Sequence, residues 1–453
     1  MAGDKSMDYR ELAQDLLKEA ERQGADGAEV IVVEDESFSV QVRMRSVDTL
    51  KSAQEKRLGL RLCFGQRSAT TATSDFSLES LQRLLSDTAA MAKATAEDPF
   101  AGLPDPAAHV SDLPDLDLWD GEAGNLPLPK RIALASRAEA AALDLDPRIA
   151  NSEGAEYSSD DAHIAFANSH GFFGEYRGSS AALSASPVAR DDGGMQRDGW
   201  YSVKRRLREL ESPEAVGRKA AQRALRRLGA RKVDTQQVPV VFDPDMAASL
   251  LRSLCGAVSG SAIYRGASFL LGKLGQQVAT SALTVVDDGR IAAGLGSRPF
   301  DGEGLPTRRT VVIKDGVLTS YLLDTYTGRK LGLCSTGNAT RSLGQRPTVG
   351  PMNFFAQPGP HAPEEIIGSV NRGLYVTEMI GFGVNLVTGD YSRGAVGIWI
   401  ENGELTHPVE EVTIAGNLKD MLMGVEMVGS DLEWRGSIAA PTLKIARMTV
   451  AGN

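Results

Sequence analysis

The histidines of this chain are its first candidates for metal chemistry, because protein zinc sites are built from histidine, cysteine and carboxylate side chains. A catalytic zinc commonly takes two of its ligands from one helix. The chain has five histidines, no two of them four or five residues apart and none followed by glutamate: His109, His163, His170, His361 and His407. The nearest pair, His163 and His170, lies in a stretch rich in serine and aspartate. The sequence therefore predicts no metal site in this chain.

Nucleophilic and phosphate-binding motifs are also missing from the sequence. There is no G-x-S-x-G turn, and Cys255 lies on the apolar stripe of a predicted helix, which favours burial over reactivity. Ser169 and His170 are adjacent, so their side chains would point apart on a strand. The glycines at 381 and 383 lack the third glycine of a dinucleotide fingerprint. We therefore predict no catalytic nucleophile and no cofactor-binding residue.

Carboxylates near glycine turns leave one alternative open. Asp301, Glu303, Asp390 and Glu401 flank such turns, and two carboxylates held together can act as acid and base. Aspartate and glutamate at turns need no functional explanation, however. An autonomous hydrolase that uses these carboxylates, or an unrecognised metal site, stays an alternative, with Asp301, Glu303 and Asp390 as its first residues to test.

Composition sets outer limits on the function. The chain has 453 residues, enough for two or three domains, and 49 basic against 59 acidic residues give a net charge of −10. This balance disfavours nucleic acid as a partner, since phosphate binding relies on clustered Lys and Arg. No apolar run reaches 18 residues, which argues against a membrane span. Three distant cysteines and a charged N-terminus without a signal-peptide pattern predict a reducing, cytoplasmic location.

The periodicity of apolar residues predicts an α+β fold, with a mixed α/β N-terminal half and a β-rich C-terminal half that has few helices. Helices are expected at residues 7–23, 78–96, 130–143, 212–228 and 246–258, and N-terminal strands at 28–34, 38–44 and 60–64. The predicted divisions are an N-terminal α/β domain (1–97), a proline-rich linker (98–129), a middle α+β segment (130–230) and a β-rich C-terminal domain (238–453).

Residues 379–425 form the most informative stretch, MIGFGVNLVTGDYSRGAVGIWIENGELTHPVEEVTIAGNLKDMLMGV. Alternating apolar runs flank Asn402-Gly403, which predicts a hairpin whose two turn residues take positive φ. Asn417 is expected to cap a short helix that follows. The pattern strand, Asp315-Gly316, strand predicts a second hairpin.

This stretch closely resembles the C-terminal signature of the TldD/PmbA family, also described as peptidase family U62 and as modulators of DNA gyrase. Two further segments resemble the same family: residues 298–339, which begin RPFDGEGLPTRR, and residues 238–278, which begin VPVVFDPDMAASLLRSLCGAV. GAEV near residue 27, NSHG at 168–171 and the final MTVAG extend the resemblance over essentially the whole chain.

The resemblance also implies what has been lost. TldD-like members carry His-Glu-x-x-x-His on the helix after the first C-terminal strand, with a distal cysteine as another zinc ligand; PmbA-like members, also called TldE, lack both. Aligned on Leu250-Leu251, the motif positions fall on Arg252, Ser253 and Ala257. Arginine repels a cation, serine cannot act as the carboxylate base, and alanine has no ligand atom. Ligands five residues apart would need a distorted helix, which Gly256 would permit, unless that glycine only allows close packing.

The resemblance therefore implies a non-catalytic subunit of a cytoplasmic zinc metallopeptidase heterodimer, a pseudoenzyme with no cofactor of its own. The expected partner is a TldD-like catalytic subunit that holds the zinc and cuts extended peptide substrates, with a homodimer possible when that partner is absent. We expect no nucleic-acid or membrane partner. A third alternative, drawn from the family name, is a binding module that modulates a DNA-linked target.

Overall fold

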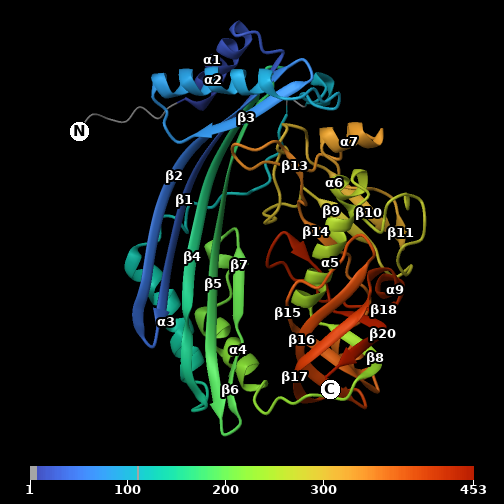
Figure 1. The fold of residues 1–453 in the computed structure, drawn as a ribbon. Coiled ribbons are helices and arrows are strands. Elements are labelled where there is room, and N and C mark those ends of the chain that lie inside the picture. The colour runs from blue at the N-terminus through green and yellow to red at the C-terminus, as the bar shows by residue number, and fades with distance from the viewer. Residues whose placement is uncertain (1–7, 110–111, 453) are drawn as a thin grey trace.

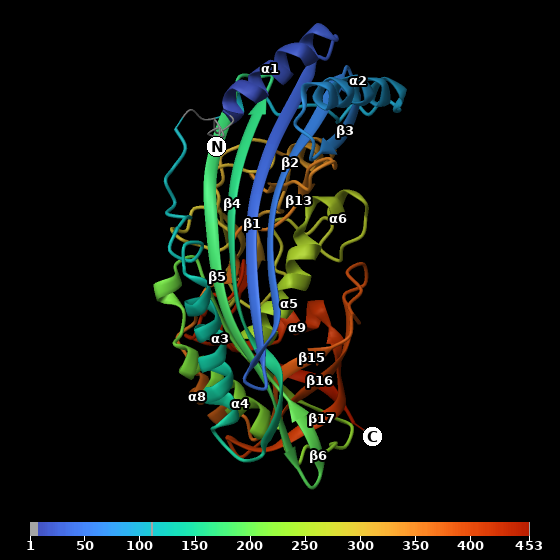
Figure 2. The same cartoon turned by 90° about the vertical axis from the view of Figure 1, so that its left-hand side faces the viewer.

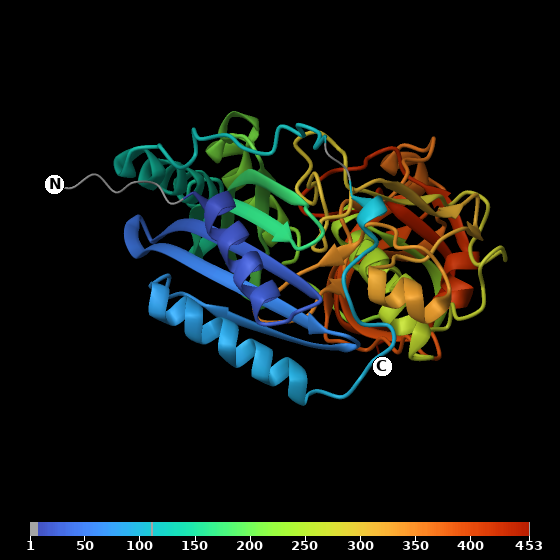
Figure 3. The ribbon, with the colours of Figure 1, turned by 90° about the horizontal axis from the view of Figure 1, so that it is seen from above.

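A tall sheet of long strands from the N-terminal half stands beside a C-terminal half built from shorter strands (Figure 1). The structure is a computed structural model that describes residues 8–109 and 112–452. Seen from above, the two halves lie next to each other (Figure 3). Within the described ranges, no helix is both long and apolar enough to cross a membrane. The α+β prediction is confirmed, with strands dominating the C-terminal half.

The N-terminal half forms one seven-stranded antiparallel sheet in the order β3-β2-β1-β4-β5-β6, with β7 also paired to β5. Its strands are β1 (Gly27–Arg43), β2 (Ser46–Phe64), β3 (Arg67–Thr73), β4 (Ile149–Asn168), β5 (Phe173–Asp191), β6 (Gly194–Arg197) and β7 (Trp200–Lys204). β1 pairs with β4 from Glu29↔Asn168 to Val42↔Ala155. Strands on both sides of the predicted linker therefore share a single sheet, while the exact domain limits stay a prediction.

The alternation of side chains along β1 explains how this sheet is covered. Val30 and Val32 pack with α1 (Tyr9–Arg22) and α2 (Leu78–Ala94), and Val40 and Val42 pack in the cluster of α3 (Leu128–Leu143) and α4 (Pro213–Leu225). These even-numbered residues share one face because strand side chains alternate. Figure 2 shows α1 and α2 at the upper end of the long strands and α3 and α4 toward their lower end. Ile31, on the other face, packs with Phe166 and with Phe300 of the C-terminal half.

The structure corrects two predictions in the N-terminal half. The two strands predicted within residues 28–44 form the single strand β1, which ends at Arg43, and residues 46–59 of β2 were not predicted as strand. Residues 46–57 are almost entirely exposed, so they lack the apolar alternation on which the prediction relied. The five predicted helices are present with ends shifted by a few residues, and Ser212 caps α4 by accepting from the Ala215 N–H at 3.3 Å.

The C-terminal half contains a strand barrel. Its sheet has the order β17-β16-β15-β8-β20-β18, and an additional β17–β20 pairing closes five of the strands into a ring. Asn402 and Gly403 have φ of 52° and 82°, which confirms the predicted hairpin turn. Asn417 caps α9 (Leu418–Met423) by accepting from the Lys419 N–H, also as predicted. The barrel strands are β8 (Gln236–Phe242), β15 (Arg372–Ile380), β16 (Asp390–Glu401), β17 (Glu404–Asn417), β18 (Val425–Val428) and β20 (Leu443–Ala451).

A second, smaller sheet in the order β11-β10-β9-β14-β19 lies on the other side of α5 (Pro244–Val258), whose apolar face is part of the common core. The Asp315-Gly316 hairpin is present, but β11 is only two residues long. The remaining elements are β9 (Val285–Asp288), β10 (Arg309–Lys314), β11 (Val317–Leu318), β12 (Ala339–Thr340), β13 (Thr348–Val349), β14 (Phe354–Ala356), β19 (Ile438–Ala439), α6 (Gly260–Tyr264), α7 (Thr325–Leu331), α8 (Pro363–Gly368), α9 (Leu418–Met423), η1 (Pro106–Ala108) and η2 (Leu207–Glu209).

Candidate functional site

Helix α5 carries the three positions that decide whether this chain could hold a zinc ion. It begins at the N-cap Asp243, whose carboxylate accepts from the Met246 N–H at 2.9 Å. Arg252 is exposed, Ser253 is half-buried, and Ala257 is completely buried in the core of the C-terminal half. The structure thus gives the three positions three different environments on one helix.

Gly256 does not distort this helix. α5 continues through Gly256 as regular α-helix and ends at Val258. A Cβ atom built on Gly256 would lie 3.1 Å from Cδ1 of Leu386, in the loop between β15 and β16. The glycine therefore serves close packing of that loop on α5, which was the second of the two readings open from the sequence.

The residues present on α5 do not fit a zinc ion. Ala257 offers no ligand atom, and Arg252 places a fixed positive charge where the first ligand would be. Burial raises the pKa of the nearby Cys255 thiol to about 12, so the thiolate that zinc requires is disfavoured. Across the described residues, no three histidine, cysteine or carboxylate side chains come together in a way that could hold a metal.

The histidines are dispersed over the structure, and each has its own neighbour. Asn168 connects two of them: its side chain is hydrogen-bonded to His109 Nε2 at 2.9 Å and accepts from the His170 backbone N–H at 3.1 Å. The other contacts are His163 Nε2 with Glu175 at 3.3 Å, His170 Nδ1 with the Pro104 carbonyl at 3.0 Å, His361 with Glu365 at 3.9 Å and His407 with Thr406 at 3.1 Å. These are structural contacts, and those of His109 and His170 connect the linker to the end of β4.

Two of the four candidate carboxylates lie together, and two do not. Asp301 and Glu303 are both buried, and Asp301 accepts three backbone N–H bonds, from Glu303, Leu305 and Ala339. Asp390 begins β16 and bonds to Thr388 and Asn417, and Glu401 is an exposed residue at the end of the same strand. The structure therefore does not assemble the proposed Asp301, Glu303 and Asp390 set.

Burial controls the protonation of the Asp301 and Glu303 pair. Burial raises the pKa of both carboxyls, and the neighbouring charges of Asp301 and Asp324 raise that of Glu303 further. Asp324 was not a candidate from the sequence; its side chain caps α7 by accepting from the Thr327 N–H at 2.7 Å. Because Asp301 is fully engaged by backbone amides, its geometry is that of a loop-holding carboxylate.

An ion cluster between the two halves was missed from the sequence. Glu29 on β1 is completely buried, and its Oε2 lies 3.2 Å from Arg61 Nη1 on β2 and 2.6 Å from Arg341 Nη2 in the C-terminal half. Burial acts to raise the pKa of Glu29, but the two arginines outweigh it and hold that pKa below its usual value. A signal was available, since Glu29 is the one charged residue in the otherwise apolar start of β1.

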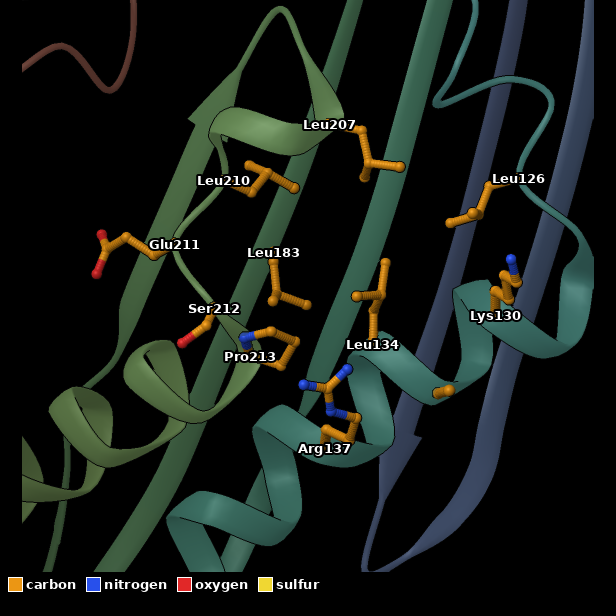
Figure 4. A pocket seen from close by; sticks show the side chains of 11 residues that line it. Leu126, Lys130, Leu134, Arg137, Leu183, Leu207, Leu210, Glu211, Ser212 and Pro213 are labelled. Carbon is orange, nitrogen blue, oxygen red and sulfur yellow. The ribbon is translucent and has the colours of Figure 1, made fainter.

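An apolar pocket of about 280 Å³ lies between α3 and the segment that leads into α4. Figure 4 shows Leu126, Leu134, Leu183, Leu207 and Leu210 around this space. At its edge Arg137 holds Glu214 through two hydrogen bonds of 2.8 and 3.0 Å. The leucines carry no reactive group, so this pocket offers packing space rather than chemistry.

A second pocket borders α5 itself. It has a volume of about 400 Å³ and is lined by Gly256 and Ser259 at the end of α5, by Arg265 after α6 and by Leu322 and Val349 opposite. Its walls are mostly apolar side chains and backbone. The side of α5 next to the lost zinc positions is therefore open to a small ligand or an extended chain.

Comparison with known proteins defines the class. Three family models of the PmbA/TldA metallopeptidases match in chain order: domain 1 over residues 28–92, the central domain over 121–228 and the C-terminal domain over 235–452. The chain belongs to the PmbA/TldD family of metallopeptidases.

Individual relatives and solved structures show how much of the chain the similarity covers. The chain is 39% identical to Metalloprotease PmbA of Escherichia coli O157:H7 over 94% of this chain and 93% of that protein. The Metalloprotease TldD homolog of Haemophilus influenzae is 30% identical over 52% of each chain. A crystal structure described as a putative modulator of DNA gyrase, from Bacteroides thetaiotaomicron, has a TM-score of 0.91 at 30% identity and covers both chains completely. TldE from Thermococcus kodakarensis shares the fold, with a TM-score of 0.88 at 23% identity over 97% of this chain and 99% of that one.

Proposed function

We propose that this chain is the non-catalytic, TldE-like subunit of a zinc metallopeptidase, and that its partner is a TldD-like chain that holds the zinc. The observation that carries the proposal is the set Arg252, Ser253 and Ala257 on α5, which supplies neither ligands nor a base. The extent of the likeness supports it too, since the PmbA relative aligns with 94% of this chain and the TldD homolog with about half.

The proposed role is to complete an enclosed site for extended peptides in the cytoplasm. The pocket beside Gly256 and Ser259 would form part of the wall on this side. Extended peptides suit such a site because backbone hydrogen bonds give affinity with little dependence on sequence. Without the partner, the proposal allows this chain to form a homodimer through the surface that would otherwise contact the TldD-like chain.

The test measures zinc content and peptidase activity of the purified chain, of the TldD-like chain and of their mixture. We expect no stoichiometric zinc and no activity in this chain alone, and activity in a mixture whose mass by light scattering is that of a heterodimer. Stoichiometric zinc together with activity in the isolated chain would overturn the proposal.

A variant separates this proposal from an autonomous carboxylate hydrolase. Glu303→Gln removes the buried carboxyl whose pKa is raised and keeps its size. If the isolated chain hydrolyses peptides and Glu303→Gln abolishes that activity, the carboxylate alternative is the correct one. We expect the variant to leave the zinc-dependent activity of the mixture in place, because Glu303 is not on α5.

A further inference from the structure

A polar pocket of about 350 Å³ lies where the N-terminal sheet meets the C-terminal half. We call it the interdomain pocket. Its lining includes Arg61, Ser68 and Thr70 from the sheet and Glu303, Tyr326 and Arg346 from the C-terminal half. Its volume falls in the range of sites for small ligands. Because both halves build it, the pocket exists only in the assembled chain.

Donors in this pocket lack acceptors. Arg61 is only 6% exposed, and although its Nη1 lies 3.2 Å from Glu29, its buried Nε has no hydrogen-bond partner within the described structure. The Ser68 and Thr70 side chains, which also line the pocket, are part-exposed and make no hydrogen bond to any described residue. An unsatisfied buried N–H costs free energy unless something accepts from it. The buried Arg61 guanidinium therefore has a donor without an acceptor beside the pocket, and the two hydroxyls can donate to the same ligand.

The charges around the pocket also favour a negatively charged ligand. Arg346 is exposed, its guanidinium lies 5.2 Å from the centre of the Tyr326 ring, and among the described residues it forms no ion pair. Asp98, the acidic group on the sheet side, already accepts from the Tyr326 hydroxyl at 2.8 Å and lies 3.7 Å from Lys330. The positive charges are thus partly unpaired, and the carboxylate opposite them is occupied.

Burial of Glu303 disfavours a negative charge in this pocket. It is 2% exposed, and one of its oxygens accepts from the Thr325 N–H at 2.8 Å. Burial, followed by the charges of Asp301 and Asp324, raises its pKa and so favours the neutral carboxyl. A neutral carboxyl can donate a hydrogen bond to an anion instead of repelling it.

We propose that the interdomain pocket binds a carboxylate, held by the guanidinium groups of Arg61 and Arg346 and by the hydroxyls of Ser68 and Thr70. Guanidinium groups match the planar carboxylate and form strong, charge-assisted hydrogen bonds with it. The carboxylate belongs either to the C-terminus of a short peptide or to a small free acid. This site is separate from the lost zinc positions on α5, and it depends on this chain alone.

The test is isothermal titration calorimetry of the full chain with three probes: trialanine, trialanine amide and succinate. We expect trialanine, succinate or both to bind and, where trialanine binds measurably, its amide to bind at least about tenfold more weakly, so that only measurable binding of both to the same extent counts as equal binding. Binding of trialanine alone identifies a peptide C-terminus, and binding of succinate alone identifies a small free acid. Equal binding of trialanine and its amide, or no binding of any probe up to about 10 mM, overturns the proposal.

Two variants and a matched control assign the binding to this pocket. Arg346→Met is expected to weaken binding about tenfold or more and to leave the fold intact, because Arg346 is exposed and unpaired in the described structure. Arg61→Lys tests the buried cation while keeping a charge beside Glu29. Arg372→Met is the control, since Arg372 is also an exposed arginine over an aromatic ring, 5.8 Å from the centre of Trp399. Equal affinities for wild type and Arg346→Met overturn the assignment.

A pH series supplies an independent readout. Arg61, Arg341 and Arg346 lie around Glu303 and favour an anion, whereas Asp98, Asp301 and Asp324 oppose one. His109 bonds to the Glu303 backbone, and burial lowers its pKa, which favours the neutral imidazole. As pH rises from 6 to about 9.5, ionisation of Glu303 is expected to weaken binding of the probe acid in wild type. Glu303→Gln, which cannot ionise, is expected to show a flatter pH dependence, and parallel curves for the two proteins count against the proposal.

Discussion

Arg341 donates from Nη2 to Glu29 Oε2 at 2.6 Å and thereby joins the C-terminal half to the first strand of the N-terminal sheet. The two residues are 312 positions apart in the chain, and both side chains are almost fully buried. Arg61 completes the cluster from β2. The contact holds the two halves in position against each other. It therefore also positions the walls of the interdomain pocket, which come from both halves.

Arg341→Met is expected to destabilise the protein strongly. The substitution removes one of the two cations that compensate the buried charge of Glu29, and breaking a buried pair in this way typically costs about 3–5 kcal/mol. Urea unfolding of wild type and variant measures the loss. Arg57→Ala on β2 is the control. Its ion pair with Asp35 of β1 is solvent-exposed, so we expect the free energy of unfolding to fall by less than about 1 kcal/mol. Equal losses for the two variants would show that burial does not govern the Glu29 cluster.

Asp243→Asn is expected to change how stability depends on pH. Burial raises the pKa of this N-cap carboxyl to about 7, above its ordinary value near 4. Between those values the folded state binds more protons than the unfolded state, so this group makes stability fall as pH rises, and its cost is complete above about pH 7. Asparagine caps helices equally well and carries no charge.

Measured at pH 4.5 and pH 8, the free energy of unfolding of Asp243→Asn relative to wild type should therefore increase with pH. Ser212→Asn, at the N-cap of α4, is the matched control: neither side chain titrates in this range, so its difference from wild type should not change between the two values. Parallel pH curves for wild type and Asp243→Asn would refute the prediction.

The sequence predicted well those features that depend on neighbours along the chain. Amphipathic helices such as α5 and the hairpin turn at Asn402-Gly403 are encoded locally, and both are present. The first part of β2 was missed because its exposed residues show no alternation; its pairing with β1 is what makes it a strand. The contact of Glu29 with Arg341 could not be predicted either, because the sequence shows an odd charge in an apolar strand and not its partner.

The site was predictable to a similar degree. The family resemblance places two of the motif positions on Arg252 and Ala257 from residue identity alone, and this assignment stays a prediction. Asp301 and Glu303 are only two residues apart, but the approach of Asp324 to Glu303 and the separation of this group from Asp390 depend on how loops distant in sequence fold together. The interdomain pocket lies outside any motif, because its walls come from both halves of the chain.

Introducing His-Glu-x-x-x-His at the α5 positions given by the family resemblance is expected to destabilise the protein mainly at Ala257. Arg252 is exposed and Ser253 half-buried, so Arg252→His and Ser253→Glu should each cost less than about 1 kcal/mol. Ala257 is completely buried in the main core, and Ala257→His forces a larger polar ring into packed space, with an expected loss of about 1–3 kcal/mol or more. Urea unfolding of the three single variants measures this. A stable triple variant with stoichiometric zinc, determined by metal analysis, would show that the core around Ala257 can accommodate a ligand.

Gly383→Ala is expected to be among the most damaging single substitutions in the glycine-dense stretch of residues 379–425. A Cβ atom at Gly383 would lie 1.7 Å from the carbonyl oxygen of Ser392, and the Ser392 N–H donates back to Gly383 at 2.7 Å. The clash is with backbone, so the loop must move, with an expected loss above about 2 kcal/mol. Gly436→Ala is the control, because that glycine has open space and no positive φ, and we expect a change within about 0.5 kcal/mol.

The position of this loop makes Gly383→Ala informative beyond stability. Leu386, three residues further on, packs against Gly256 of α5, so displacement of the loop should loosen the end of the helix that borders the second pocket. Hydrogen exchange of the amides at the C-terminal end of α5 should then be faster in Gly383→Ala than in wild type, and unchanged in Gly436→Ala. If Gly383→Ala lowers stability without faster exchange in α5, the loop acts only on its own hairpin. If exchange in α5 rises as well, the glycines of this stretch shape the helix onto which the family resemblance places the zinc-motif positions.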